Sequence, residues 1–113
     1  MNEPTVMPDP DRELGDVATR VVHENERVRI WELTLEPGER SDVHEHTMDY
    51  ILVFLAGDRI GVIPEPDTAG EFTEAMDFAP PIGKAIFVRG GGIETAVNCG
   101  AEQYREILIE LKD

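Results

Sequence analysis

Short apolar runs separated by turn residues make up most of the chain after residue 14. Runs of this length, with Gly, Pro, Asn and Asp between them, are typical of antiparallel β-sandwiches and barrels. About nine strands are predicted, one of them holding the only closely spaced histidines and another centred on an apolar stretch at 72–78. The remaining predicted strands cover residues 17–23, 27–36, 50–56, 59–63, 84–88, 93–97 and 104–112.

No extended helix is predicted, because no segment carries an apolar repeat of helical period over any length. Residues 11–17 are the one place where a single helical turn is expected. Residues 1–13 contain Pro4, Pro8 and Pro10 among acidic residues, which predicts a flexible N-terminal arm. Residues 14–113 are then predicted to form one barrel domain.

The strand predicted at 27–36 has an irregular pattern. Val28 and Ile30 share one parity, whereas Trp31, Leu33 and Leu35 share the other. The change of phase predicts either a bulge near Ile30 or burial of both faces of the strand.

The charge of the chain excludes several classes of partner. Ten basic and 24 acidic residues give a net charge of −14, which argues against binding to nucleic acid or to an anionic membrane. Cys99 is the only cysteine, so an internal disulfide is ruled out and a reducing compartment is favoured. No leader pattern or membrane-length apolar stretch is evident. We therefore expect an acidic cytoplasmic protein.

His44 and His46 are the candidate metal ligands. They lie one residue apart, just before the most apolar run of the chain. Residues at i and i+2 of a strand face the same side, and imidazole is the commonest metal ligand among side chains. The alternative is a pair of strand-end histidines with no ligand.

Two spaced motifs resemble those of the cupin superfamily. Gly38, His44, His46 and Gly57 match the first motif, in which the usual glutamate position holds Tyr50. The second motif is matched by Gly83, Gly91 and Asn98, with Arg89 at its proline position and Glu94 at its histidine position. The resemblance implies an all-β fold, the cupin jelly roll or double-stranded β-helix barrel.

A narrower resemblance is to small single-domain, RmlC-like cupins, some of which are assigned to β-alanine degradation. It rests on the segment 24–31, on the Asp49-Tyr50 pair and on the closing segment 107–112. By the same resemblance the chain is expected to form a homodimer.

Carried over residue by residue, the resemblance implies a divalent metal held by His44, His46 and Glu94. Two imidazoles and one carboxylate suit Fe, and equally Zn, Mn or Ni. Tyr50 is the candidate catalytic residue, positioning water or substrate. The implied function is a metal-binding cupin acting on a small organic molecule inside the barrel, with dioxygenase-like or isomerase-like chemistry. The alternative is a non-catalytic ligand-binding or structural cupin with a degenerate metal site.

Several other residues have a simpler interpretation beside a functional one. Arg40 and Arg89 either hold a carboxylate substrate at the barrel mouth or pair with nearby acidic residues. Asn98 is expected to bond backbone groups at a strand end, and Cys99 to be a small, partly buried thiol. The run 90–92 of three glycines is interpreted as a tight turn between two strands.

Overall fold

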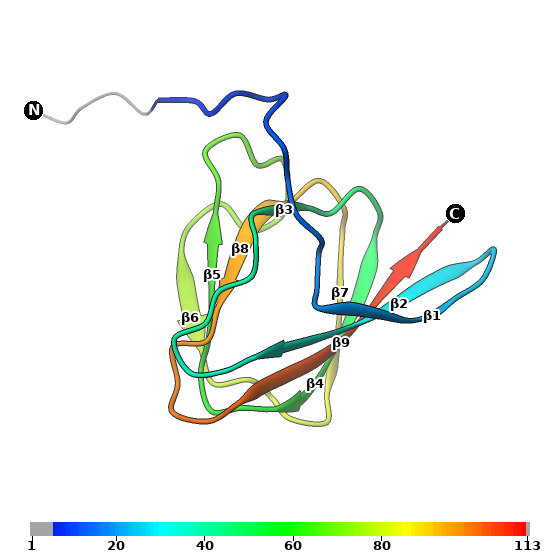
Figure 1. Ribbon diagram of the computed structural model, residues 1–113, viewed down its shortest axis with the longest axis vertical. Helices are drawn as coiled ribbons and strands as arrows, with labels where there is room; N and C mark the ends of the chain where they lie inside the picture. Colours follow the sequence, from blue (N-terminus) through cyan, green and yellow to red (C-terminus); the bar gives the residue numbers. More distant parts are fainter. Residues whose placement is uncertain (1–5, 113) are drawn as a thin grey trace, which may run out of the picture.

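Two antiparallel sheets face each other in the computed structural model, which describes residues 6–112 (Figure 1). The predicted all-β class is confirmed, since the described residues form strands, turns and loops and no helix. No helix in this part of the chain could therefore span a membrane. Residues 1–5 of the predicted arm lie outside the described residues.

The larger sheet has the strand order β1-β2-β9-β4-β7. Its strands are β1 (Arg20–Glu24), β2 (Val28–Leu35), β9 (Tyr104–Leu111), β4 (Tyr50–Ala56) and β7 (Ala85–Val88). The smaller sheet has the order β3-β8-β5-β6. Its strands are β3 (His44–Glu45), β8 (Ile93–Val97), β5 (Ile60–Pro64) and β6 (Met76–Phe78).

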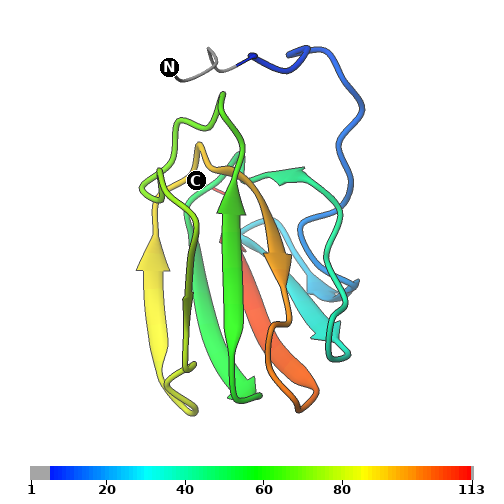
Figure 2. The same ribbon diagram turned by 90° about the vertical axis from the view of Figure 1, so that its left-hand side faces the viewer.

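The helical turn predicted for residues 11–17 is wrong. A single turn closes where the Arg12 amide donates to the Asp9 carbonyl at 3.2 Å, and the chain then runs on without helical structure. The Gly15 amide donates to the Val43 carbonyl at 2.9 Å, and Arg12 forms an ion pair with Asp67 at 2.9 Å. These contacts carry the N-terminal segment over one end of the sandwich before it descends to β1 (Figure 2).

The irregular pattern of β2 reflects burial of both faces. Its pairing with β9 is continuous from Val28 to Leu35, so β2 contains no bulge. The bulge lies in the neighbouring strand β1, where Val22 is inserted between the partners of Trp31 and Ile30. Val28 and Ile30 are partly covered on the outer face, which is why they break the alternation.

The core lies between the sheets, mostly on the inner face of the larger one. Its most buried apolar members each expose 4% of their surface or less, so apolar burial dominates the stability of this layer. They are Leu33, Leu35, Tyr50, Phe54, Ile60, Val88, Tyr104 and Leu108.

Two carboxyl groups interrupt this apolar face. Glu106 and Glu110 lie on β9 at the same parity as Leu108, and both are buried. The Trp31 indole Nε1 donates to Glu110 Oε1 at 2.6 Å, and the Arg29 guanidinium lies 3.8 Å from the same oxygen. Burial of Glu110 is thus compensated by a partner from β2.

We expect Trp31→Phe to destabilise the fold by about 1–3 kcal/mol, because Glu110 would lose its buried donor. Urea unfolding of the single variants and of Trp31→Phe combined with Glu110→Met measures the coupling between the two residues. The double variant should recover part of the loss. A strictly additive double variant would show that the indole–carboxyl bond contributes nothing.

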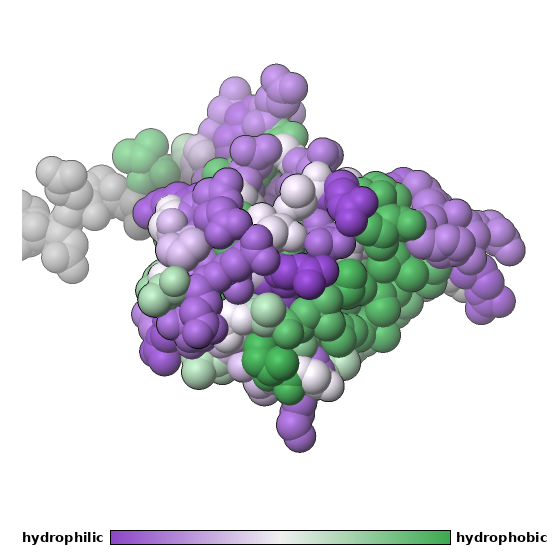
Figure 3. All heavy atoms as spheres, turned by 60° about the horizontal axis from the view of Figure 1, so that its bottom comes forward, coloured by the Kyte–Doolittle hydropathy of each residue, from purple (hydrophilic) through white to green (hydrophobic). Residues whose placement is uncertain are grey.

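The outer face of the larger sheet is apolar as well. Phe87, Ile51, Ile109 and Ile30 are register neighbours in a row across β7, β4, β9 and β2. Phe87 is 55% exposed, and Figure 3 shows apolar residues gathered on this side of the molecule. Because one face of an antiparallel sheet is commonly polar, this band is unusual. The homodimer stays a prediction.

Candidate metal centre

The pairing of β3 with β8 brings His44 beside Glu94. β3 has only two residues, and its register places His44 directly opposite Glu94 and Glu45 opposite Ile93. Side chains directly opposite one another in an antiparallel pair point to the same face. The imidazole and the carboxyl therefore both enter the space between the sheets, where both are buried.

The glycine run 90–92 holds His46 in place. The Gly91 amide donates to the His46 carbonyl at 2.6 Å, and the His46 amide donates to the Gly92 carbonyl at 2.8 Å. The run joins two strands, as predicted, but β7 and β8 belong to different sheets, so the run crosses between the sheets. A side chain is excluded there: a Cβ on Gly90 would lie 2.9 Å from the Met48 backbone.

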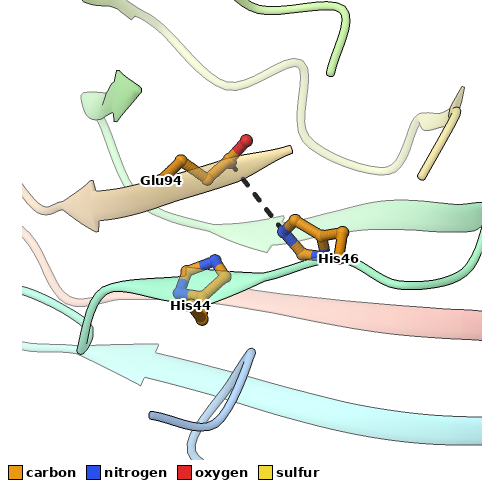
Figure 4. A group of neighbouring side chains, drawn as sticks. All are labelled: His44, His46 and Glu94. Atoms are coloured by element: carbon orange, nitrogen blue, oxygen red, sulfur yellow. Dashed lines mark ion pairs between the residues drawn. The ribbon is translucent and has the colours of Figure 1, made fainter. Parts of the chain in front are cut away.

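Three potential ligand atoms converge on one point. The nearest ligand atoms of His44, His46 and Glu94 all lie within 4.8 Å of one another, and His46 Nε2 is 3.9 Å from Glu94 Oε2 (Figure 4). Two donors about 2.1 Å from one metal can be at most about 4.2 Å apart. The group would thus need to draw together by roughly half an ångström to share an ion, a shift within the range of side-chain rotation.

Burial keeps both imidazoles neutral. It lowers the pKa of His44, and it lowers the pKa of His46 to about 3, with the neighbouring His44 adding to the effect. A neutral imidazole has a free lone pair, which is the form that binds a metal. Both histidines are therefore in the ligand form near pH 7.

The second nitrogen of each ring shows how the rings are oriented. His44 Nδ1 lies 2.8 Å from the Asp42 carbonyl, and as donor to that oxygen it leaves Nε2 as the lone-pair nitrogen. His46 Nδ1 is buried and has no hydrogen-bond partner among residues 6–112. A buried nitrogen without a partner is costly, which is a feature of functional sites more often than of plain cores.

Burial also destabilises the charged form of the Glu94 carboxyl and raises its pKa to about 7. The contact drawn as an ion pair in Figure 4 is therefore not one near pH 7, since His46 is neutral there. Without a cation, three polar groups share an apolar space. A divalent ion would stabilise the carboxylate form and accept both lone pairs, so the donor set fits such an ion.

Tyr50 occupies the position of the usual glutamate without taking over its chemistry. Its ring stacks on the His46 imidazole with centroids 4.1 Å apart and 21° between the planes. Burial raises the pKa of its hydroxyl, and repulsion from the Glu94 and Glu106 carboxylates raises this pKa further. A phenol that stays neutral is a poor metal ligand, so Tyr50 packs against a donor and lines the cavity. Its catalytic role stays a prediction.

A cavity of about 120 Å³ lies beside the three donors, between the two sheets. Tyr104 and Glu106 line it from β9, and sequence reasoning did not single out either of them. The available signal was a carboxyl two residues from a tyrosine on the same face of a predicted strand. Arg40 and Arg89 do not line this cavity. Arg89 is 79% exposed and lies 4.0 Å from Glu71, as the simpler interpretation expected.

The remaining candidates have structural roles or none. Asn98 is fully buried, and its amide donates to the carbonyls of Leu35 and Glu102 at 2.9 and 2.8 Å, as predicted. Cys99 is exposed, so the prediction of a partly buried thiol is wrong.

The glycines of both motifs are required by backbone conformation. Gly38, Gly57, Gly83 and Gly91 are the four glycines with positive φ among the described residues, and no other residue type there has one. A positive φ is strained for residues with a Cβ. Both sequence motifs therefore mark turns that the fold itself needs.

Comparison with solved structures gives the class of fold. A cupin domain from Bordetella pertussis Tohama I superposes with a TM-score of 0.68 at 24% identity, covering 83% of this chain and 91% of that one. A cupin superfamily protein from Desulfitobacterium hafniense DCB-2 gives a TM-score of 0.61 at 19% identity, covering 100% and 97%.

An RmlC-like cupin family protein with a double-stranded β-helix fold, from Methanocaldococcus jannaschii, gives a TM-score of 0.64 at 16% identity, covering 98% and 92%. No protein-family model and no curated protein sequence matches the chain. The chain has the double-stranded β-helix fold of the cupins, as predicted, with a buried His-His-Glu group that could bind a metal.

Proposed function

We propose that the chain is a divalent-metal-binding cupin that acts on a small organic molecule held between its sheets. His44, His46 and Glu94 would hold the ion. The observation that carries the proposal is the convergence of these three buried donors beside a cavity. Small-molecule sites are typically concave and apolar with a few convergent polar groups, and this space has that composition.

The ion would supply Lewis-acid activation of a bound oxygen group, or oxygen chemistry if it is iron. The chain's own residues would orient the ligands and exclude water. His44 is oriented by its hydrogen bond to the Asp42 carbonyl. His46 is fixed by its backbone hydrogen bonds to Gly91 and Gly92, and the apolar walls would exclude water. The Tyr50 hydroxyl would bond the substrate or a water. A dioxygenase or an isomerase would both fit this arrangement.

Metal analysis of protein made without a polyhistidine tag tests the proposal. We expect stoichiometric Zn²⁺ or Fe²⁺ after equilibration, and an affinity at least about 100-fold lower in His44→Ala, as loss of one strong ligand implies. His23→Ala is the matched control, because His23 lies exposed on β1, in the other sheet. Equal metal content in wild type and His44→Ala would exclude the proposed centre.

A second candidate is a non-catalytic cupin that binds a small ligand. The stacking of Tyr50 on His46 favours it, because a ring fills the position of the usual fourth ligand and leaves three donors. Thermal melting with and without a chelator separates the two functions. A metal-dependent protein should lose stability on chelation, whereas a ligand-only barrel should melt at an unchanged temperature.

A further inference from the structure

The larger sheet presents a carboxyl to the cavity that the proposed metal centre does not use. Glu106 lies on β9, across the space from Glu94 on β8, and is only 6% exposed. The Tyr104 hydroxyl donates to Glu106 Oε1 at 2.5 Å. No other hydrogen bond to this carboxyl comes from residues 6–112. Its second oxygen is therefore free to accept a bond from a molecule inside the cavity.

The cavity has room for a compact apolar molecule. Its volume of about 120 Å³ is close to that of a dry engineered cavity of about 150 Å³ that binds benzene. Most of its walls are aliphatic or aromatic, and the residues include Leu33, Leu52, Phe54, Val62, Phe78 and Leu108. Contact with these walls would supply affinity through apolar burial.

The polar groups of the cavity select against anions. Two carboxyl groups, Glu94 and Glu106, line it, and neither lysine nor arginine does so among the described residues. Burial and the charge of Glu94 already disfavour a negative charge on Glu106, since they raise its pKa to about 7. A carboxylate ligand would add repulsion, whereas a hydroxyl or amine would donate to Glu106.

We propose that Tyr104 and Glu106 form an anchoring pair that binds the hydroxyl or amine of a compact, non-anionic apolar ligand. The opposite end of that ligand would reach His44, His46 and Glu94. This inference rests on the small-molecule part of the proposed function and does not require a bound metal. It names the class of molecule that the cavity takes: an alcohol, phenol or amine of about benzene size.

Phenol, toluene and benzoate are the probes that test it. Phenol and toluene have nearly the same shape and differ in one donor, and benzoate carries the negative charge. Each is titrated into chelator-treated protein at pH 8 and into Zn²⁺-loaded protein, with amide shifts of β9 and β4 as the readout. We expect phenol to bind about tenfold more tightly than toluene, the ratio that one hydrogen bond to a charged group gives, and benzoate not to bind.

Single substitutions test which residue makes phenol bind more tightly than toluene. Glu106→Leu should remove the advantage of phenol and leave toluene within about twofold of wild type. Glu110→Gln, a matched buried carboxyl on the same face that does not line the cavity, should change neither. Glu94→Gln should keep the preference in chelator-treated protein while losing Zn²⁺.

Three results would overturn the inference: equal binding of phenol and toluene to wild type, absence of β9 shifts with either probe, or a phenol preference that disappears in Glu94→Gln and persists in Glu106→Leu. The wild-type ratio decides the matter even if Glu106→Leu does not fold. Failure to take up Zn²⁺ with an intact phenol preference would count against the metal centre and support the anchoring pair.

Discussion

Glu106→Gln is expected to stabilise the metal-free protein at pH 8 by about 2–3 kcal/mol and to leave its stability nearly unchanged at pH 5. The carboxyl is fully enclosed, and burial raises its pKa from 4.5 to about 7. A raised carboxyl pKa means that the folded state holds the proton more tightly than the unfolded state does. Its stabilising contribution is therefore complete below about pH 4.5 and is lost as the pH rises through 7.

In the folded state at pH 8 the wild-type protein bears a buried charge that glutamine lacks. In the folded state at pH 5 both side chains are neutral. The histidines are common to both proteins, so their own titration cancels in the difference. Urea unfolding at the two pH values, with a chelator present, measures it. A variant that is less stable than wild type at pH 8 would contradict the argument.

Glu24→Gln provides a control of opposite sign. Glu24 is bonded to Arg29 and Lys112, which lower its pKa to about 2. A lowered carboxyl pKa stabilises the folded state above about pH 4.5, and this contribution is lost as the pH falls toward 2. Its replacement should destabilise the protein at pH 8, by a small amount because these groups are solvent-exposed.

Phe54→Ala is expected to cost about 3–5 kcal/mol of unfolding free energy, the usual range for truncating a fully buried aromatic residue. Phe54 is 2% exposed and meets Phe78 of the opposite sheet edge-on, with ring centroids 6.0 Å apart. Its loss would enlarge the cavity and remove a contact that joins the two sheets. The variant should also bind apolar probes less selectively.

The next residue along the chain is the matched control for Phe54. Leu55 lies at a bulge in β4, where the pairing with β9 skips one position, and is 38% exposed. Leu55→Ala should cost less than about 1 kcal/mol, because little apolar surface is lost. Thermal or urea unfolding of both variants makes the comparison. Similar losses would mean that Phe54 does not bridge the sheets as described.

The strand positions could be predicted from local spacing, whereas the grouping of Glu94 with His44 and His46 was implied by the resemblance to the cupin motifs. Glycine-bounded apolar runs locate strands within a few residues, because turns need residues that tolerate unusual φ values. The motif spacing placed Glu94 near the histidines, and the β3–β8 register brings it opposite His44. Metal coordination by this group stays a prediction.

Other features depend on tertiary packing that local patterns do not encode. In β9 the more apolar set of alternating side chains, Ile107, Ile109 and Leu111, is the less buried one, so the pattern indicates the wrong face as the inner face. Glu106 was missed for that reason. The phase change in β2 predicted either a bulge near Ile30 or burial of both faces, and the fold shows the second, with the extra residue in the neighbouring strand β1.

The close packing around the glycine run 90–92 limits the substitutions that this sequence can accept. Position 92 is unspecified in the cupin motif, yet a Cβ there would lie 2.9 Å from Glu94 Oε1. A side chain at position 92 would therefore displace the Glu94 carboxyl from its place beside the histidines, whereas a change at position 94 leaves Gly92 unaffected. Relatives that keep a glutamate at the equivalent of 94 should keep glycine two residues before it, whereas those with a different donor there are free to vary.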